Sequence, residues 1–292
     1  MTHLHRRHVI GAALASLSLR PHALWAAETD LAALERKTGG RLGVFAMVPD
    51  EGELLSRRAD ETFGMCSTFK AFLAGMLLDD VMRQNLDASR NFDISGLTLL
   101  PHSPVIERYR EAGADSMTLL TLIEAIVTIS DNTAANVLLR LIGGPRAFTD
   151  RARDIVGSDA IRLDRYEIEL NRTTPEDPRD KASPRAMAEG LSALLYGGAI
   201  HPQAGLMLKA MMADSLTGRS RLRAGFPAGA FVGDKTGISG QGLFGDIAFI
   251  EREDGRRAVV ACYVDAAGLS GKDAAAVHRE VGRLTNAALG AA

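Results

Sequence analysis

Hydrophobic and polar positions follow strand spacing at both ends of the chain and helical spacing in the middle. Near the amino end, a short helical pattern at 31–37 precedes an apolar stretch at 42–47, which predicts a strand. Turn-forming residues at 49–52 then bring the chain back in a second strand at 53–58. The folded part is therefore predicted to begin with a β-hairpin.

The middle of the chain is predicted to be mostly helical up to Tyr196. Apolar residues recur there at helical spacing in three main stretches, 67–84, 117–129 and 134–141. Strand patterns return at 231–233, 243–250 and 258–264, the last two joined by a turn at 254–255. A final helical pattern covers 273–289.

This order of elements predicts an α/β sheet domain that is interrupted by an all-helical one. We expect the sheet part to comprise 27–63 and 215–292, and the inserted helical part to comprise 64–214. Together they form one unit at 27–292 with a cleft between the two parts.

Composition excludes several classes of protein. The chain has 292 residues, of which 46% are hydrophobic and 24% charged, as in an ordinary globular enzyme. Its net charge of −2 comes without blocks of like charge, so no nucleic-acid partner is expected. Apolar runs are too short for a membrane span. Cys66 and Cys262 fit no metal motif, which leaves two buried thiols or a single disulfide bridge.

The first 26 residues have the features of a removable export signal. Arg6 and Arg7 precede a mildly apolar stretch at 9–19, and Ala26 and Ala27 follow it. The arginine pair favours the twin-arginine route over the general secretory route. The alternative is an amino terminus that stays attached. We expect an exported protein, periplasmic or secreted.

Ser67 and Lys70 form an S-x-x-K pattern at the start of the helical pattern at 67–84. One helical turn puts both on the same face, where the amine can take the proton of the hydroxyl and make it a nucleophile. The helix amino terminus favours a developing oxyanion. The alternative is a helix cap followed by a solvated lysine.

Two further tripeptides make a chance occurrence of the S-x-x-K pattern less probable. They are Ser130, Asp131 and Asn132 after an apolar helix, and Lys235, Thr236 and Gly237 after the short strand at 231–233. Each alone is compatible with a helix cap or a turn at the end of a strand. All three patterns in this order rarely arise by chance.

The three patterns together resemble those of the class A β-lactamases, members of the penicillin-binding superfamily of serine enzymes. The segment 165–171 looks like the loop that carries the deacylating carboxylate in that family, here Glu167. The resemblance extends over nearly all of 27–292. It implies a mainly antiparallel sheet flanked by helices, hydrolysis of the β-lactam amide bond of penicillin- and cephalosporin-type antibiotics, no cofactor or metal, and a monomer.

The resemblance also implies a role for each site residue. Ser67 is the nucleophile, Lys70 a proton acceptor or relay, and Ser130 the donor to the departing nitrogen. Glu167 deprotonates the hydrolytic water, which Asn171 helps to hold. The residues expected to contact the substrate are Asn132, Lys235, Thr236, Gly237 and Ile238. The backbone N–H groups of Ser67 and Ile238 are expected to form the oxyanion hole. Arg165 and Asp180 resemble the ion pair that closes the loop.

Several positions depart from the family pattern. Ile238 replaces a usual hydroxyl residue, which leaves the preference among substrates open. Arg221 is the candidate for a second cation on the substrate carboxylate, or else a surface arginine. His102 either lines the mouth of the cleft or is an exposed loop residue. Cys66 matches a cysteine that is bridged in a carbapenem-hydrolysing subgroup, but Ser239 stands at the partner position.

Three functions compete at this point. The first is an exported serine β-lactamase that confers antibiotic resistance, favoured by all four segments and the leader. The second is a D-alanyl carboxypeptidase, which normally lacks the loop of Glu167. The third is a β-lactam sensor that acylates once, which normally needs a membrane anchor. Substrate spectrum, inhibitor susceptibility, the acylation base and the signal cleavage site stay open.

Overall fold

The computed structural model describes residues 19–174 and 176–291, and it has an α/β fold. Most of the predicted export segment at 1–26 lies outside the described residues. The described chain begins in helix α2 (Leu19–Thr38), which is longer than the predicted 31–37. Alanines at 23, 26 and 27 favour its extension towards the amino end.

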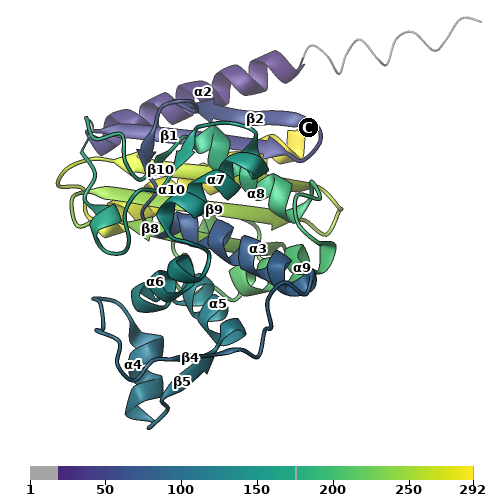
Figure 1. The fold of residues 1–292 in the computed structure, drawn as a ribbon. Helices are drawn as coiled ribbons and strands as arrows, with labels where there is room; N and C mark the ends of the chain where they lie inside the picture. The colour runs from purple at the N-terminus through teal and green to yellow at the C-terminus, as the bar shows by residue number, and fades with distance from the viewer. Residues whose placement is uncertain (1–18, 175, 292) are drawn as a thin grey trace, which may run out of the picture.

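A five-stranded antiparallel sheet forms the centre of the molecule (Figure 1). Its strands are β1 (Arg41–Val48), β2 (Gly52–Arg57), β8 (Phe231–Ile238), β9 (Leu243–Glu251) and β10 (Arg257–Asp265). They lie in the order β2-β1-β10-β9-β8, so strands from the two ends of the chain are neighbours at β1 and β10. The predicted hairpin and the predicted antiparallel sheet are confirmed.

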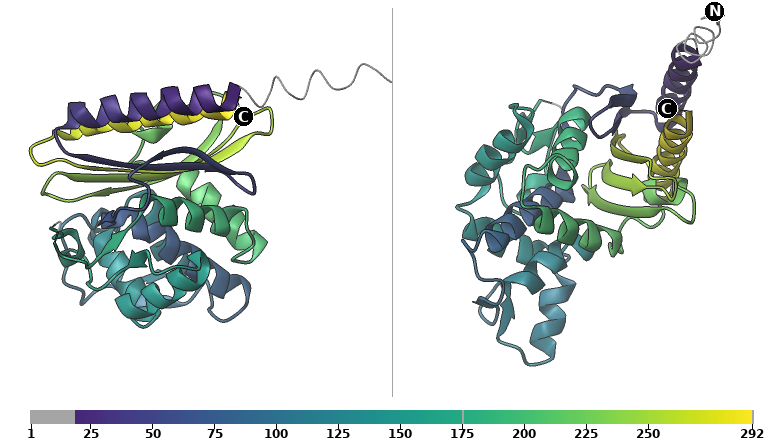
Figure 2. Two further views of the ribbon diagram at one scale, coloured as in Figure 1. Left: turned by 90° about the horizontal axis from the view of Figure 1, so that it is seen from above. Right: turned by 90° about the vertical axis from the view of Figure 1, so that its right-hand side faces the viewer.

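Two helices cover one face of this sheet. α2 and α10 (Gly271–Ala291) lie side by side across it, as the left view of Figure 2 shows. Their apolar side chains, Val281 of α10 among them, pack on the alternate strand residues that face them, including Val44 and Val260. This face is closed by helices from both chain ends.

The helical part covers the other face. Its helices are α3 (Phe69–Met82), α4 (Pro104–Glu111), α5 (Leu119–Thr128), α6 (Asn132–Leu141), α7 (Pro145–Val156), α8 (Pro184–Leu195) and α9 (Pro202–Ala213). α3 is apolar on all sides and buried from Phe69 to Leu78, as expected of a central helix. α8 contacts β1 and β10, and α9 contacts β8, so sheet and helices share one hydrophobic core.

Short elements that the hydrophobic pattern does not reveal complete the fold. They are the strands β3 (Phe63–Gly64), β4 (Asn91–Asp93), β5 (Ser116–Thr118), β6 (Ile161–Arg162) and β7 (Lys181–Ala182), and the 3-10 turns η1 (Cys66–Thr68), η2 (Glu169–Asn171) and η3 (Leu222–Gly225). Elements of two or three residues carry too few positions to show a period.

The position of the Lys-Thr-Gly triplet corrects the sequence prediction. The sequence pattern predicts a strand that ends at Gly233 with the triplet after it, but β8 continues to Ile238. Lys235, Thr236 and Gly237 pair in register with Ile247, Asp246 and Gly245 of β9. Backbone pairing with a buried strand keeps these polar residues extended, which propensity alone does not predict.

Both cysteines are buried free thiols, which excludes the disulfide alternative. Cys66 belongs to the core between the sheet and the helical part, whereas Cys262 belongs to the core beneath α2 and α10. The sheet separates the two cores, so the thiols face different layers.

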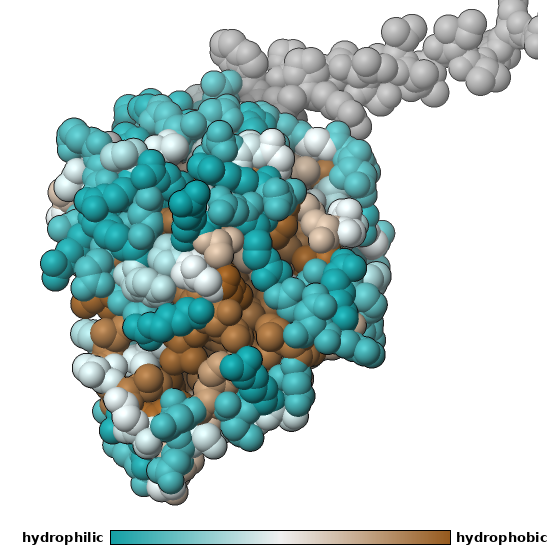
Figure 3. Space-filling model, in the orientation of Figure 1, coloured by the Kyte–Doolittle hydropathy of each residue, from teal (hydrophilic) through white to brown (hydrophobic). Residues whose placement is uncertain are grey.

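The face of the molecule drawn in Figure 3 combines polar residues with an apolar area. In Figure 3, apolar residues gather in the middle of the visible face, where the helices of the helical part meet below the sheet. Among the described helices, none is both long and apolar enough to cross a membrane.

Candidate active site

Ser67 lies in η1, immediately before helix α3, and its position is fixed from both sides. Thr68 donates a hydrogen bond to Met65 O at 2.7 Å and is hydrogen-bonded to the Tyr263 hydroxyl of β10 at 2.9 Å. Gly237 of β8 lies against the same turn. A Cβ added at Gly237 would lie 2.8 Å from Met65 O and 3.0 Å from Ser67 N. A glycine at this position therefore lets β8 approach the backbone of Ser67.

Lys70 is fully buried, and its ammonium group lies at the centre of the site. It donates to Asn132 Oδ1 at 2.6 Å and to Ser130 O at 3.0 Å. It also forms an ion pair with Glu167 Oε1 at 2.9 Å. The alternative of a solvated lysine is thereby excluded.

The hydroxyl of Ser67 is hydrogen-bonded to Glu167. Ser67 Oγ donates to Glu167 Oε1 at 3.3 Å, and within the described chain no hydrogen bond joins Ser67 to Lys70. Ser67 and Lys70 both contact the same atom, Glu167 Oε1, and do not hydrogen-bond each other directly in the described chain. The carboxylate of Glu167 lies between the hydroxyl and the amine because it accepts from both.

Ser130 bridges the two lysines. Its Oγ accepts from Lys235 Nζ at 3.0 Å and from Lys70 Nζ at 3.4 Å. The backbone of Ser130 has a positive φ of 67°, which turns this loop into the site after α5. Burial and the nearby charge of Lys70 lower the pKa of Lys235 to about 7. Two amine donors leave the proton of the Ser130 hydroxyl available to a third partner.

Asp131 holds this loop in place through backbone groups of two helices. Its Oδ1 accepts from Ala134 N at 2.9 Å and caps α6. Its Oδ2 accepts from Val105 N at 3.0 Å in the first turn of α4. The middle residue of the Ser-Asp-Asn triplet therefore joins two helices.

The loop that carries Glu167 is held by Asn136 of α6, a residue for which the sequence analysis predicts no role. Asn136 Oδ1 accepts from Glu167 N at 2.9 Å, and Asn136 Nδ2 donates to Glu167 O at 2.8 Å. The one available signal is its spacing, since Asn132 and Asn136 lie one helical turn apart on the same face.

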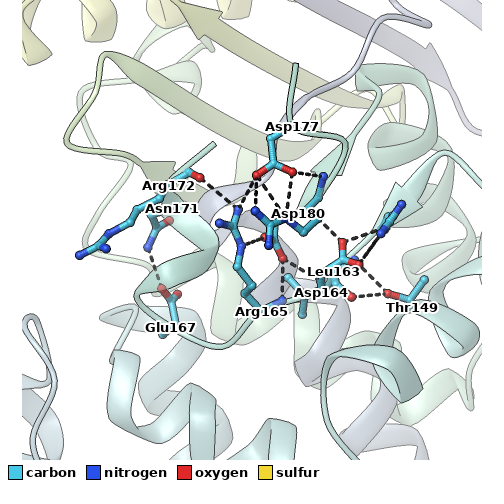
Figure 4. A network of polar contacts seen from close by, with 11 residues as sticks. Thr149, Leu163, Asp164, Arg165, Glu167, Asn171, Arg172, Asp177 and Asp180 are labelled. Carbon is cyan, nitrogen blue, oxygen red and sulfur yellow. Dashed lines mark hydrogen bonds and ion pairs between the residues drawn. The ribbon is translucent and has the colours of Figure 1, made fainter. Parts of the chain in front are cut away.

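Asn171 and an ion pair between Arg165 and the buried Asp180 complete the loop, as Figure 4 shows. Asn171 Nδ2 donates to Glu167 Oε2 at 2.7 Å, while Asn171 Oδ1 is buried and has no partner among the described residues. Arg165 pairs with Asp180, whose other oxygen accepts from Asp164 N at 2.7 Å and Arg165 N at 2.9 Å. The expected Arg165–Asp180 pair is present.

Strand β8 brings a row of polar groups along the same site. Lys235 is fully buried, and Thr236 Oγ1 donates to Thr217 Oγ1 at 2.7 Å. Arg221 is only 5% exposed, and its Nη1 donates to Gly245 O at 2.9 Å, so it is not a surface arginine. Ile238, at the end of β8, has a side chain that is 53% exposed.

Asn132 and His102 differ in their surroundings. Asn132 Nδ2 donates to Pro101 O at 2.7 Å, and its Oδ1 accepts from Lys70, so both ends of its amide have partners. His102 is an exposed loop residue whose Nε2 lies 2.9 Å from Ile129 O. Its backbone carbonyl accepts from Asn132 N at 3.0 Å.

The charge pattern of the site suits an anionic substrate. Two buried ammonium groups meet at Ser130, and Glu167 is the carboxylate that contacts Lys70. No group of three or more His, Cys, Asp and Glu side chains with the arrangement of a metal site occurs among the described residues. The arrangement offers a hydroxyl nucleophile, a base and hydrogen-bond donors for acyl transfer.

Comparisons with known proteins agree with this chemistry. The family model of the beta-lactamase enzyme family matches residues 26–289. Beta-lactamase FAR-1 of Nocardia farcinica is 40% identical over 239 residues, which cover 80% of this chain and 74% of that protein. The carbapenem-hydrolyzing beta-lactamase KPC of Klebsiella oxytoca is 39% identical over 262 residues, 89% of this chain and 87% of that protein.

Solved structures give the same result. An ancestral class A beta-lactamase is 43% identical, with a TM-score of 0.84 over 88% of this chain and 98% of the other. A beta lactamase from Burkholderia vietnamiensis is 34% identical, with a TM-score of 0.84 over 97% of this chain and 98% of the other. Among the three functions considered, these matches favour the first. The chain belongs to the class A serine β-lactamases, and it hydrolyses the β-lactam amide bond of penicillin- and cephalosporin-type antibiotics through a serine acyl-enzyme, which confers resistance.

Proposed function

We propose that Ser67 is the nucleophile of this β-lactamase and that Glu167 is the base in both halves of the reaction. The observation that carries this proposal is the shared acceptor, Glu167 Oε1, which lies 3.3 Å from Ser67 Oγ and 2.9 Å from Lys70 Nζ. A general base has to lie within hydrogen-bond reach of the proton that it removes. Glu167 meets this condition for Ser67.

In the acylation step, Ser67 Oγ attacks the lactam carbonyl while its proton moves to Glu167. The ammonium group of Lys70 remains against the carboxylate and against Ser130. The backbone N–H groups of Ser67 and Ile238 bind the oxyanion, and loss of one such donor typically costs about 100- to 1,000-fold in rate. The close approach of Gly237 to Ser67 N supports this pairing of β8 with the nucleophile.

Ser130 then delivers a proton to the ring nitrogen as the amide bond breaks. Its hydroxyl accepts from Lys235 at 3.0 Å and from Lys70 at 3.4 Å, so its own proton is free to move to the substrate. A proton returns to Ser130 from Lys70, and Lys70 in turn takes the proton from Glu167, with which it pairs at 2.9 Å. Glu167 is then a carboxylate again. The acyl-enzyme results, with the ester on Ser67.

In the deacylation step, Glu167 and Asn171 hold a water molecule, and Glu167 takes a proton from it as its oxygen attacks the ester. Glu167 then passes that proton to the departing Ser67 Oγ, which lies 3.3 Å from Glu167 Oε1. The amide nitrogen of Asn171 donates to Glu167, and its buried Oδ1 is an acceptor with no partner in the described chain. A water bound to both residues would satisfy that oxygen, because buried polar atoms are normally hydrogen-bonded. The loop therefore distinguishes a recycling enzyme from one that acylates once.

The substrate carboxylate binds to Lys235, Thr236 and Ser130, with Arg221 supplying a second positive charge. Lys235 contacts Ser130 directly, and Arg221 lies beneath β8, where its Nη1 is 3.4 Å from Gly237 O. Asn132 contacts the acylamide side chain of the substrate, and Gly237 and Ile238 line the edge of β8. The side chain of Ile238 offers no hydroxyl to the substrate.

Class A β-lactamases are generally exported, and we propose the periplasm or the exterior as the location of this one. The arginine pair at 6–7 and the apolar stretch at 9–19 support a signal peptide that uses the twin-arginine route. Fractionation of cells that express the full chain tests this. Replacing both arginines by lysine is expected to retain the protein in the cytoplasm. We further propose that the mature enzyme is a monomer.

Mass spectrometry with a penicillin tests the assignment of the nucleophile. The wild-type enzyme is expected to form a covalent adduct and Ser67→Ala to form none, while Ser89→Ala, on an exposed loop, behaves as wild type. An adduct on the Ser67→Ala variant would move the nucleophile elsewhere. Multiple turnover of nitrocefin by the purified wild-type protein tests the recycling step.

A further inference from the structure

Two buried aspartates lie next to Thr236 on one face of the sheet. Asp246 of β9 pairs directly with Thr236 of β8, and Asp234 lies two residues before Thr236 on the same strand. Alternate residues of a strand point to the same face, so Asp234, Thr236 and Asp246 share one face. Both carboxyl groups are 0% exposed. Asp234 and Asp246 are therefore diagonal neighbours across the strand pair.

The two aspartates have unequal partners. Asp234 forms a close ion pair with Arg223, whose Nη2 and Nε lie 2.6 and 2.7 Å from Asp234 Oδ1. Asp246 Oδ2 accepts one backbone hydrogen bond, from Leu222 N at 3.1 Å. Asp246 Oδ1 is buried without a partner, and among the described residues no cation forms an ion pair with Asp246.

An ionised carboxylate in this position would be unfavourable. A fully buried charge needs an ion partner or several hydrogen bonds, and Asp246 has one hydrogen bond. Burial raises the pKa of Asp246 well above its ordinary value, and the charge of Asp234 raises it further. Two adjacent carboxyl groups hold one proton between them more easily than they ionise together. Arg223 favours the charge on Asp234, which leaves the proton to Asp246.

The other titratable groups around this pair are cationic or neutral. The cations are Lys235 of β8, Arg221 just before η3, and Arg223 within η3. The remaining titratable groups near the pair or near Arg221 are Cys262 and Tyr263 of β10 and His278 of α10. Burial raises the pKa of Cys262 and of Tyr263 and lowers the pKa of His278 to about 3, so these three are uncharged at neutral pH. With Asp246 neutral, Asp234 is the one anion in this set.

We propose that Asp246 carries a proton at neutral pH, donates it towards Asp234, and thereby leaves the positive charge of Arg221 available to the carboxylate of the bound substrate. Asp246 touches no reacting group, so it is a positioning residue that acts through its neighbours. The part of this inference that concerns Arg221 rests on the proposed function. The protonation of Asp246 does not.

Stability of the Asp246→Asn variant tests the proton directly. Asparagine has the shape and the neutral charge of a protonated aspartic acid, and its amide can still donate to Asp234. In the unfolded chain Asp246 has an ordinary pKa, so the folded wild type loses stability as the pH rises above that value, whereas the variant does not. We expect equal melting temperatures in acid and a higher melting temperature for the variant at neutral pH, the difference widening with pH.

Asp265→Asn is the matched control, because Asp265 is a partly exposed aspartate of β10 that pairs with Arg41 at 2.8 Å. It is expected to gain no stability as the pH rises. Three results would overturn the proposal: a less stable Asp246→Asn variant at neutral pH, failure of that variant to fold, or a difference in melting temperature that does not depend on pH. Each would mean that the negative charge of Asp246 is part of the folded state.

Infrared spectroscopy gives a second readout that does not depend on catalysis. The wild type at neutral pH is expected to show the carbonyl stretch of a protonated carboxyl group, and Asp246→Asn is expected to lose that band. Persistence of the band in the variant would overturn the assignment. A several-fold fall in the KM of the variant for a penicillin would overturn it too, since it would mean that a negative charge had been removed. Absence of turnover in wild type and variant alike would instead count against the proposed function.

Discussion

The side-chain amide of Asn136 holds the backbone of Glu167 from both sides. It accepts from Glu167 N at 2.9 Å and donates to Glu167 O at 2.8 Å. The carboxylate that lies between Ser67 and Lys70 is therefore aimed by a helix of the helical part and not by its own loop alone. Positioning of Glu167 and its chemistry are separable by mutation.

Asn136→Ala is expected to slow deacylation more than acylation, by about tenfold or more. Without the amide, the backbone N–H and C=O of Glu167 each lose their hydrogen-bond partner. Each unsatisfied buried group lowers the free energy of unfolding by about 1–3 kcal/mol, and the carboxylate is no longer held in position. Pre-steady-state kinetics with a penicillin should show a burst followed by slow turnover. Asn85→Ala, at an exposed position, serves as the control, and equal kinetics of the two variants would contradict the positioning role.

The pH dependence of substrate affinity is expected to follow Lys235. Burial and Lys70 lower the pKa of Lys235 to about 7, so its ammonium group is charged below that pH and neutral above it. Because the charged form attracts the substrate carboxylate, the KM for a penicillin should rise as the pH passes through about 7. The Lys235→Arg variant keeps its charge, so its KM should not rise over this range. A parallel rise in both proteins would assign the titration to another group.

Arg221→Ala is expected to raise the KM by about tenfold with a smaller change in kcat. A charge-assisted contact of this kind contributes about 1.5–3 kcal/mol, and it persists from the bound substrate through acylation. Arg219→Ala, two residues earlier at an exposed position, is the control. Equal KM values for the two variants would mean that Arg221 does not bind substrate. Its role would then be structural, through its hydrogen bonds to Gly237 O of β8 and Gly245 O of β9.

The parts of the fold that depend on long hydrophobic periods were predictable from the sequence. The hairpin of β1 and β2, the long strands β9 and β10 and the helices α3, α5, α6 and α10 all coincide with predicted stretches to within a few residues. The length of β8 was not predictable, because its polar end is extended by pairing with β9. Side-chain period carries no information about such pairing.

In the site, too, the residues of the motifs were predictable, whereas contacts between distant segments were not. Motif order pointed to Ser67, Lys70 and Ser130, which the fold brings together around buried ammonium groups. The hydrogen bond of Ser67 to Glu167 depends on a loop 100 residues away in sequence, so the spacing of Ser67 and Lys70 could not reveal it. Asn136 and Asp246 were missed because their importance lies in burial and in partners, which a single sequence does not display.

The Glu167→Ala variant, mixed with a penicillin and followed by mass spectrometry over time, tests the central claim most directly. Glu167 is 2% exposed and contacts Ser67, Lys70 and Asn171, whereas Glu169 in the same loop is exposed, so Glu169→Ala is the matched control. We predict an acyl-enzyme that accumulates and persists on Glu167→Ala and no lasting adduct on Glu169→Ala. Rapid turnover by Glu167→Ala at the wild-type rate would contradict the account.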